Sequence, residues 1–174
     1  MHRASSEGIR EAIEKAGAYL SDHPEDARYT DSQATAVIQS GLRATVSGPA
    51  GASLTTDMPS SVGGTESAPS AGWFLRAAEA SCAATLIAMR AAQLNVSLDR
   101  IEVTVDSESD DRGILGIDHG TPAGPLSTRV HARIVAASAE RGQLDQIVRW
   151  AIDHCPVIDA VRRAVPLTID IEIG

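Results

Sequence analysis

The feature that most constrains the fold of this chain is a long segment, Trp73 to Gln93, that contains neither proline nor glycine. Alanine, the strongest helix former, is its commonest residue. Many of its side chains are small, namely Ala77, Ala78, Ser81, Cys82, Thr85 and Ala88. We therefore predict one long helix whose backbone another helix or a sheet can approach closely.

Alternation of apolar and polar residues predicts strands before and after this helix. The predicted strands are residues 33–39, 42–47, 52–57, 100–108, 126–136 and 166–173. Turns at 40–41 and 48–51 separate the first three strands, which we expect to form an antiparallel meander. Residues 114–117 are either a short strand or an insertion.

Three further helices are predicted. Apolar residues at helical spacing mark a surface helix from Ile9 to Leu20, capped by Ser5 or Ser6 and ended at His23-Pro24. Residues 143–154 form an amphipathic helix, and Pro156 can begin another that runs to about residue 164. A meander followed by mixed helices and strands indicates an α+β fold.

Charge and length exclude some classes of protein. The 174-residue chain carries a formal net charge of −8, which disfavours binding to nucleic acid phosphates and to anionic membranes. No apolar run approaches the ~20 residues that span a bilayer. The first 21 residues are too charged for a secretion signal. We therefore expect a cytoplasmic protein, in which a structural disulfide is uncommon.

The chain has two cysteines, Cys82 and Cys155, which could be inert core thiols, metal ligands or redox groups. No CxxC motif is present, and the five histidines are too scattered for a local zinc site. Phosphate-binding and dinucleotide-binding glycine motifs are also absent, so we expect no metal and no cofactor. Cys155 lies directly before Pro156, at the N-cap of a predicted helix, where backbone amides favour a thiolate.

Three stretches resemble the OsmC/Ohr family of thiol peroxidases and their relatives. The first runs from Thr55-Thr56-Asp57-Met58-Pro59 through Gly63-Gly64 to Ser67-Ala68-Pro69-Ser70, and is similar to the family's approach to its long helix. The second is Leu75 to Cys82, which looks like the family's "LLxAAxxSC", and the third is Cys155-Pro156-Val157, like its "CPV". We assign residues 32–174 to an OsmC-like domain and residues 1–31 to the N-terminal helical extension of a divergent branch.

The resemblance implies antiparallel strands around two central helices in an intertwined homodimer, with the two cysteines close together near the interface. It implies that Cys82 is the peroxidatic thiolate, which attacks an organic hydroperoxide and becomes a sulfenic acid. Cys155 would be the resolving thiol, which forms a disulfide with Cys82. A small dithiol or a lipoylated protein would then reduce this disulfide, as part of an oxidative stress response.

Two charged groups of the family's peroxidases have no counterpart at the expected places. A Glu about ten residues before the first cysteine is missing, since Pro69 to Trp73 includes no carboxylate. An Arg in the turn of the first strand pair is also missing, since we assign that turn to Gly48-Pro49-Ala50-Gly51, which carries no cation.

Other charged residues could replace them. Glu79 is one helical turn before Cys82, and Arg76 is one turn before Glu79, so we include both as candidate catalytic residues. The competing interpretation is a surface ion pair. Arg43 is another candidate cation, although a solvent-facing strand residue is the more common case. His154 could acidify Cys155, but an exposed histidine in the last helical turn is the commoner arrangement.

Two functions remain open at this point. The first is a cysteine-based, thiol-dependent hydroperoxide reductase. The second is a non-catalytic OsmC-like dimer that binds a small molecule or senses redox state, and the missing Glu and Arg keep this alternative open. Trp73 and Phe74 could line an apolar entrance to a site, or could be ordinary core residues.

Overall fold

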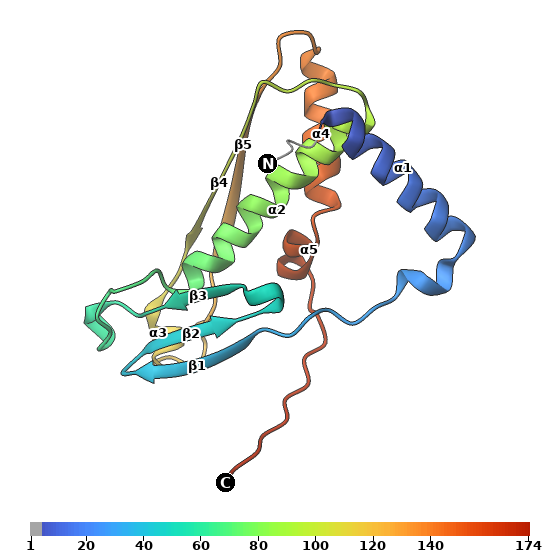
Figure 1. The fold of residues 1–174 in the computed structure, drawn as a ribbon. Coiled ribbons are helices and arrows are strands. Elements are labelled where there is room, and N and C mark those ends of the chain that lie inside the picture. The colour runs from blue at the N-terminus through green and yellow to red at the C-terminus, as the bar shows by residue number, and fades with distance from the viewer. Residues whose placement is uncertain (1–4) are drawn as a thin grey trace. The chain divides into compact units, whose positions relative to one another are not determined.

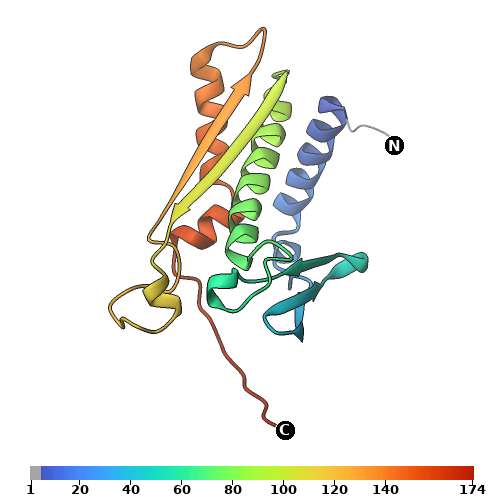
Figure 2. The same cartoon turned by 90° about the vertical axis from the view of Figure 1, so that its left-hand side faces the viewer.

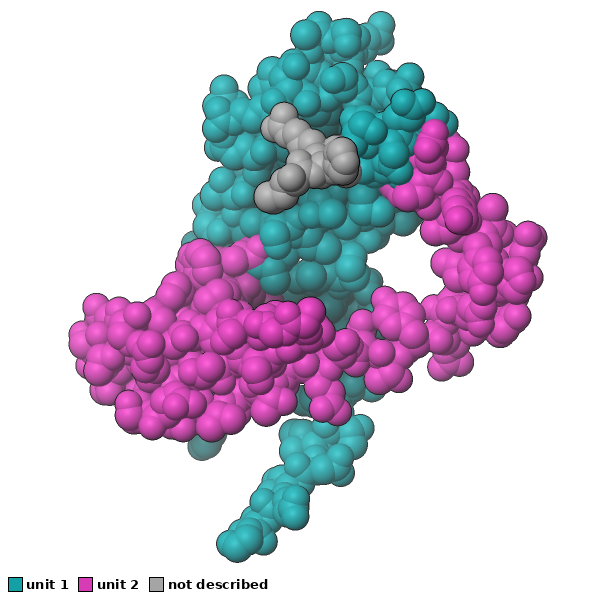
Figure 3. Space-filling model, in the orientation of Figure 1, with its two compact units in different colours: residues 1–10, 78–174 teal, residues 11–77 magenta. Residues whose placement is uncertain are grey.

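The computed structural model describes residues 5–174 and divides the chain into two units (Figure 3). One unit comprises residues 1–10 and 78–174, and the other comprises residues 11–77. Two helices, α1 (Ser6–Asp22) and α2 (Ala71–Gln93), run from one unit into the other (Figure 1). The predicted mixture of antiparallel strands and helices, an α+β fold, is confirmed.

The N-terminal helix α1 has the predicted limits. The Ser5 hydroxyl accepts a hydrogen bond from the Gly8 N–H at 3.1 Å, which satisfies one of the free amides of the first turn. The chain then turns at His23 into a short 3-10 helix, η1 (Pro24–Ala27). None of the residues of α1 is buried.

The unit of residues 11–77 contains a three-stranded antiparallel meander. Its strands are β1 (Thr35–Ser40), β2 (Arg43–Ser47) and β3 (Ser53–Thr56), in the order β1-β2-β3. Gly41, with φ of 56°, makes the tight turn between β1 and β2, and the 3-10 helix η2 (Pro49–Gly51) joins β2 to β3. A third 3-10 helix, η3 (Ser60–Val62), lies in the loop that leads to α2.

The other unit is a long hairpin covered by helices. Strands β4 (Arg100–Glu108) and β5 (Ser127–Val135) pair antiparallel along their whole length, from Arg100 opposite Val135 to Glu108 opposite Ser127. Helix α4 (Arg141–Asp153) and the part of α2 in this unit cover one face of the hairpin (Figure 2).

The core of this unit forms where that face meets the two helices. Ile87 of α2 and Ile147 of α4 are fully buried there, together with Ala151. Alternate strand residues, such as Val103 of β4 and Ala132 of β5, pack against them. The period-two pattern that predicted these strands therefore identifies the face that meets the helices.

The predicted strand at residues 166–173 is not observed, nor is the short strand that was one of the two alternatives for residues 114–117. Residues 114–117 are not a strand, because Asp110 caps a short helix, α3 (Asp111–Ile114), and Gly116 then turns with φ of 67°. Residues 166–173 form no strand, and their backbone makes no hydrogen bond to any described residue. Their apolar alternation is that of a strand, but a strand also requires a neighbouring strand with which to pair.

Among the helices of residues 5–174, none is both long enough and apolar enough to cross a lipid bilayer.

Candidate active site

The two cysteines lie in one small cluster, although they are far apart in the sequence. Cys82 is in the middle of α2, and Cys155 is at the junction between α4 and α5 (Pro156–Arg162). Cys155 is fully buried with Ala83 and Ile158, and half-buried Cys82 packs against this group. Both residues are free thiols. The predicted proximity of the two side chains is therefore observed, whereas their catalytic roles remain a prediction.

The surroundings of Cys82 favour its protonated form. Burial raises the pKa of the Cys82 thiol, and a hydrogen bond with the Cys155 side chain raises it further. The backbone N–H of Val157 acts in the opposite direction, because it donates to the sulfur and lowers the pKa. The sequence predicted that amides at this helix start would serve Cys155, but Cys155 makes no such capping bond and the Val157 amide faces Cys82.

The backbone at the α4–α5 junction holds Cys155 in place. The His154 ring stacks on Trp150 at a centroid distance of 4.1 Å, and its Nδ1 donates to the Trp150 carbonyl at 2.8 Å. The Cys155 carbonyl accepts a hydrogen bond from the Asp159 N–H at 2.9 Å, which starts the first turn of α5. His154 is exposed, as the commoner interpretation predicted, and its ring is engaged with Trp150.

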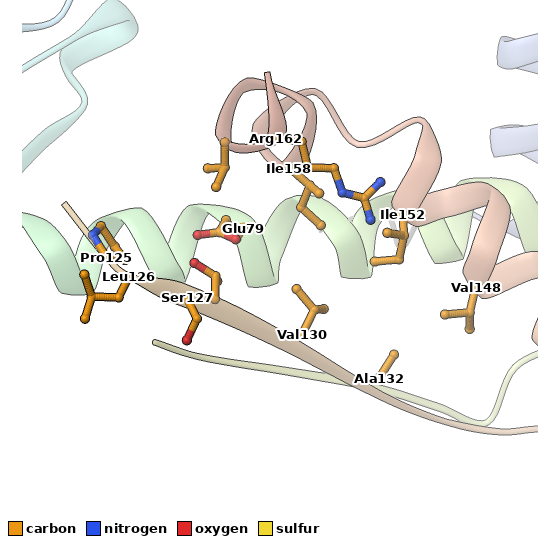
Figure 4. Close-up of a pocket in the computed structure, with 12 residues that line it drawn as sticks. Glu79, Pro125, Leu126, Ser127, Val130, Ala132, Val148, Ile152, Ile158 and Arg162 are labelled. Carbon is orange, nitrogen blue, oxygen red and sulfur yellow. The ribbon is translucent and has the colours of Figure 1, made fainter. Parts of the chain in front are cut away.

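Glu79 is not a surface residue, because it is only 2% exposed. It lines a cavity of about 580 Å³ between α2, β5, α4 and α5, together with Ser127 and Arg162 (Figure 4). Ile158 lies between this cavity and the cysteine cluster, since it lines the cavity and also packs against Cys155. Neither cysteine lines the cavity. Arg76, the other candidate on α2, is half-buried and belongs to the unit of residues 11–77.

Sequence reasoning missed a buried carboxylate in the unit of residues 11–77. One oxygen of Asp57, which is 2% exposed, accepts hydrogen bonds from the backbone N–H and the hydroxyl of both Thr65 and Ser67, at 2.6–3.2 Å. The other accepts from the Met58 N–H at 2.8 Å. These donors hold the pKa of Asp57 well below its usual range. Asp57 thus fixes the loop that precedes α2, and only its small polar neighbours in the sequence hinted at this role.

Arg43 is connected to this loop. Its Nη1 donates to the Ser67 hydroxyl at 2.5 Å, and Ser67 in turn donates to Asp57. The structure also corrects the position of the first turn. The first strand pair is β1–β2, and its turn is at Gly41-Leu42, directly before Arg43. The Gly48–Gly51 turn, which carries no cation, belongs to the second pair.

Among the described residues, no group of three or more His, Cys, Asp or Glu side chains could hold a metal ion.

Comparison with known proteins identifies the family. The model of the family described as OsmC-like protein matches residues 64–170, which is more than half of the chain and includes both cysteines. The chain belongs to the OsmC-like protein family. No match was found among curated proteins.

Solved structures agree with this OsmC-like fold. An OsmC-like protein from Mycoplasma pneumoniae matches with a TM-score of 0.66 and 12% identity, over 79% of this chain and 91% of that one. An organic hydroperoxide resistance protein OsmC from Legionella pneumophila matches with a TM-score of 0.59 and 22% identity, over 78% and 91%. The organic hydroperoxide resistance protein OhrB of Bacillus subtilis matches with a TM-score of 0.51 and 19% identity, over 78% and 93%. At these identities the likeness establishes the fold, and the activity is a separate question.

Proposed function

We propose that this OsmC-like protein reduces organic hydroperoxides with a Cys82–Cys155 dithiol, within an oxidative stress response in the cytoplasm. The proposal rests on one observation: two free thiols, partly exposed Cys82 and buried Cys155, lie in a single cluster. The names of the Legionella and Bacillus structures, which are hydroperoxide resistance proteins, support the same chemistry.

The reaction has three steps. The Cys82 thiolate attacks one peroxide oxygen, an S–O bond forms, the O–O bond breaks, and the leaving alkoxide takes a proton to become an alcohol. The Cys155 sulfur then attacks the sulfur of the Cys82 sulfenic acid, which releases water and forms a disulfide. A small dithiol or a lipoylated protein returns two electrons and two protons, which restores both thiols.

Since burial raises the pKa of Cys82, fast attack on a peroxide requires electrostatic assistance. We propose Arg43 as a contributor, because it directly follows the turn of the first strand pair, the turn in which the resembling peroxidases carry an arginine. Its hydrogen bond to Ser67, and through Ser67 to Asp57, holds the guanidinium in a defined position. We propose that Glu79 and Arg76 influence Cys82 from α2, as carboxylate and counter-cation.

Thiol counting tests the proposal. One equivalent of cumene hydroperoxide should consume two thiols per chain, and dihydrolipoamide should restore both. Cys82→Ser should abolish turnover, whereas Cys155→Ser should stop at a sulfenic acid that dimedone traps. Arg43→Gln should slow the first step at least tenfold, and Arg28→Gln, at an exposed loop residue, serves as the matched control. Steady peroxide consumption by Cys82→Ser would end the proposal.

The second candidate function is a non-catalytic dimer that binds a small molecule or senses redox state. The raised pKa of Cys82 and a cavity that neither cysteine lines favour this alternative. It predicts thiols that survive excess hydroperoxide, and a small molecule that native mass spectrometry detects in the purified protein. In either case we propose a homodimer, which sedimentation equilibrium would detect.

A further inference from the structure

The cavity beside Glu79 has the size and the lining of a ligand site. Its volume of about 580 Å³ falls within the range of small-molecule pockets, roughly 300–1,000 Å³. All the residues that line it belong to the unit of residues 1–10 and 78–174. Apolar side chains form most of the wall, among them Val130, Ala132, Val148, Ile152, Ile158 and Val161. The dithiol reaction leaves this space unused, since neither cysteine lines it.

A buried carboxylate faces this apolar space. Glu79 of α2 is 2% exposed, and Figure 4 shows its carboxylate extending toward Ser127 of β5. Ser127 and Thr128 add two hydroxyl groups to the lining. A carboxylate that is removed from bulk water is stable only beside positive charge or hydrogen-bond donors. Its two oxygens offer about four acceptor sites, so the Glu79 carboxylate can serve a ligand in addition to groups of the protein.

One cation, Arg162 at the end of α5, also lines the cavity but does not reverse this preference. Its Nη1 lies 3.4 Å from a carboxylate oxygen of Asp153, and its side chain is 57% exposed. Water and salt therefore screen the charge of Arg162, which Asp153 already balances. Glu79 is shielded from solvent, so its charge acts on the contents of the cavity with less screening and attracts a positively charged group.

We propose that this cavity binds an aliphatic amine in its protonated form. The ammonium group donates charge-assisted hydrogen bonds to the Glu79 carboxylate, and the aliphatic chain packs against Val130, Ala132 and Ile152. A bare metal cation gains nothing from the apolar wall, and a fatty acid has the wrong charge for Glu79. This inference goes beyond the proposed function, because it holds whether or not the two thiols react with peroxide.

Three six-carbon probes test this assignment on the full chain by isothermal titration calorimetry at pH 7. They are hexylamine, which is protonated at this pH, hexanol, and sodium hexanoate. Hexylamine should bind at least tenfold more tightly than hexanol, and hexanoate should bind most weakly because Glu79 repels it. This comparison uses the wild-type protein alone, so it does not depend on how a buried substitution affects folding.

A pair of variants then assigns the preference to one carboxylate. Glu79→Gln keeps the size of the side chain and removes its charge, so it should weaken hexylamine binding at least tenfold and leave hexanol binding within twofold. Glu140→Gln removes the same charge from the exposed residue that precedes α4, and this matched control should keep the wild-type affinity for hexylamine. Circular dichroism checks that both variants fold.

Three outcomes would overturn the proposal. The first is the absence of hexylamine binding at millimolar concentration, and the second is an affinity for hexanol or hexanoate that equals that for hexylamine. The third is an equal effect of both variants on hexylamine binding, which would mean that the amine follows the net charge of −8 and not this carboxylate. None of these readouts uses peroxide or counts thiols, so failure of this site and failure of the dithiol reaction are distinguished.

Discussion

The pH dependence of Cys82 reactivity follows from its surroundings. Burial and the hydrogen bond with Cys155 raise the pKa of Cys82. A thiol whose pKa is raised above the ordinary value of about 8.5 is mostly protonated at pH 7.4. Since only the thiolate reacts, alkylation of Cys82 by iodoacetamide should accelerate about tenfold per pH unit from pH 6.5 to 8.5, without a plateau. Peptide mass spectrometry separates this labelling from that of buried Cys155.

Replacement of Cys155 tests how far this residue raises the pKa of Cys82. Cys155→Ala removes the hydrogen bond and the electrostatic interaction with Cys155, both of which raise the Cys82 pKa, so the midpoint of the profile should move to lower pH. If the midpoint falls by one pH unit, alkylation at pH 7.4 should become about tenfold faster. Cys155→Ser keeps a hydrogen-bonding group of similar size and should move the midpoint less. Because alanine can also improve access to Cys82, the midpoint is the readout. A wild-type plateau below pH 8, or an unchanged midpoint in Cys155→Ala, would refute this account of the site.

Two further predictions concern stability. The folded pKa of Asp57 lies below its unfolded value, so its contribution is complete above about pH 4 and is lost as the pH falls further. Asp57→Asn should therefore lower the urea midpoint of unfolding at pH 7. It should also reduce the loss of stability that the wild-type protein shows below pH 4. An equally large loss in the variant would show that other carboxylates cause it. Ile147 of α4 is fully buried against the sheet, so Ile147→Ala should lower the free energy of unfolding, measured with urea, by about 3 kcal/mol. Ile114→Ala, at a residue that is 56% exposed, is the control and should change stability by under ~0.5 kcal/mol.

Local sequence patterns predicted most of the helices and strands because their determinants are local. The limits of β4 coincide with the prediction, and those of α2 and α4 differ by two residues or fewer. The failures have a different origin. Ile114 and Ile117 have the composition of a strand, but a capping aspartate and two glycines decide the backbone. Residues 166–173 have the correct alternation, yet pairing depends on a distant strand that no local pattern reveals.

The candidate site was predictable only in part for the same reason. The family resemblance placed Cys82 and Cys155 together, which spacing alone could not do. The role of Asp57 was missed because its donors follow eight and ten residues later and are recruited by the fold of the loop. The turn before Arg43 was misplaced because two glycine-containing turns, at 41 and 48–51, compete in the sequence for the same assignment.

The cysteine cluster also joins distant parts of the chain. A covalent bond between the two sulfurs would staple α2 to the start of α5 and close a loop of roughly 70 residues. In the chain-entropy description, such a crosslink disfavours the unfolded chain by about 4 kcal/mol. Oxidised protein should then melt at a higher temperature than reduced protein, so the melting temperature of the protein would depend on its exposure to oxidants.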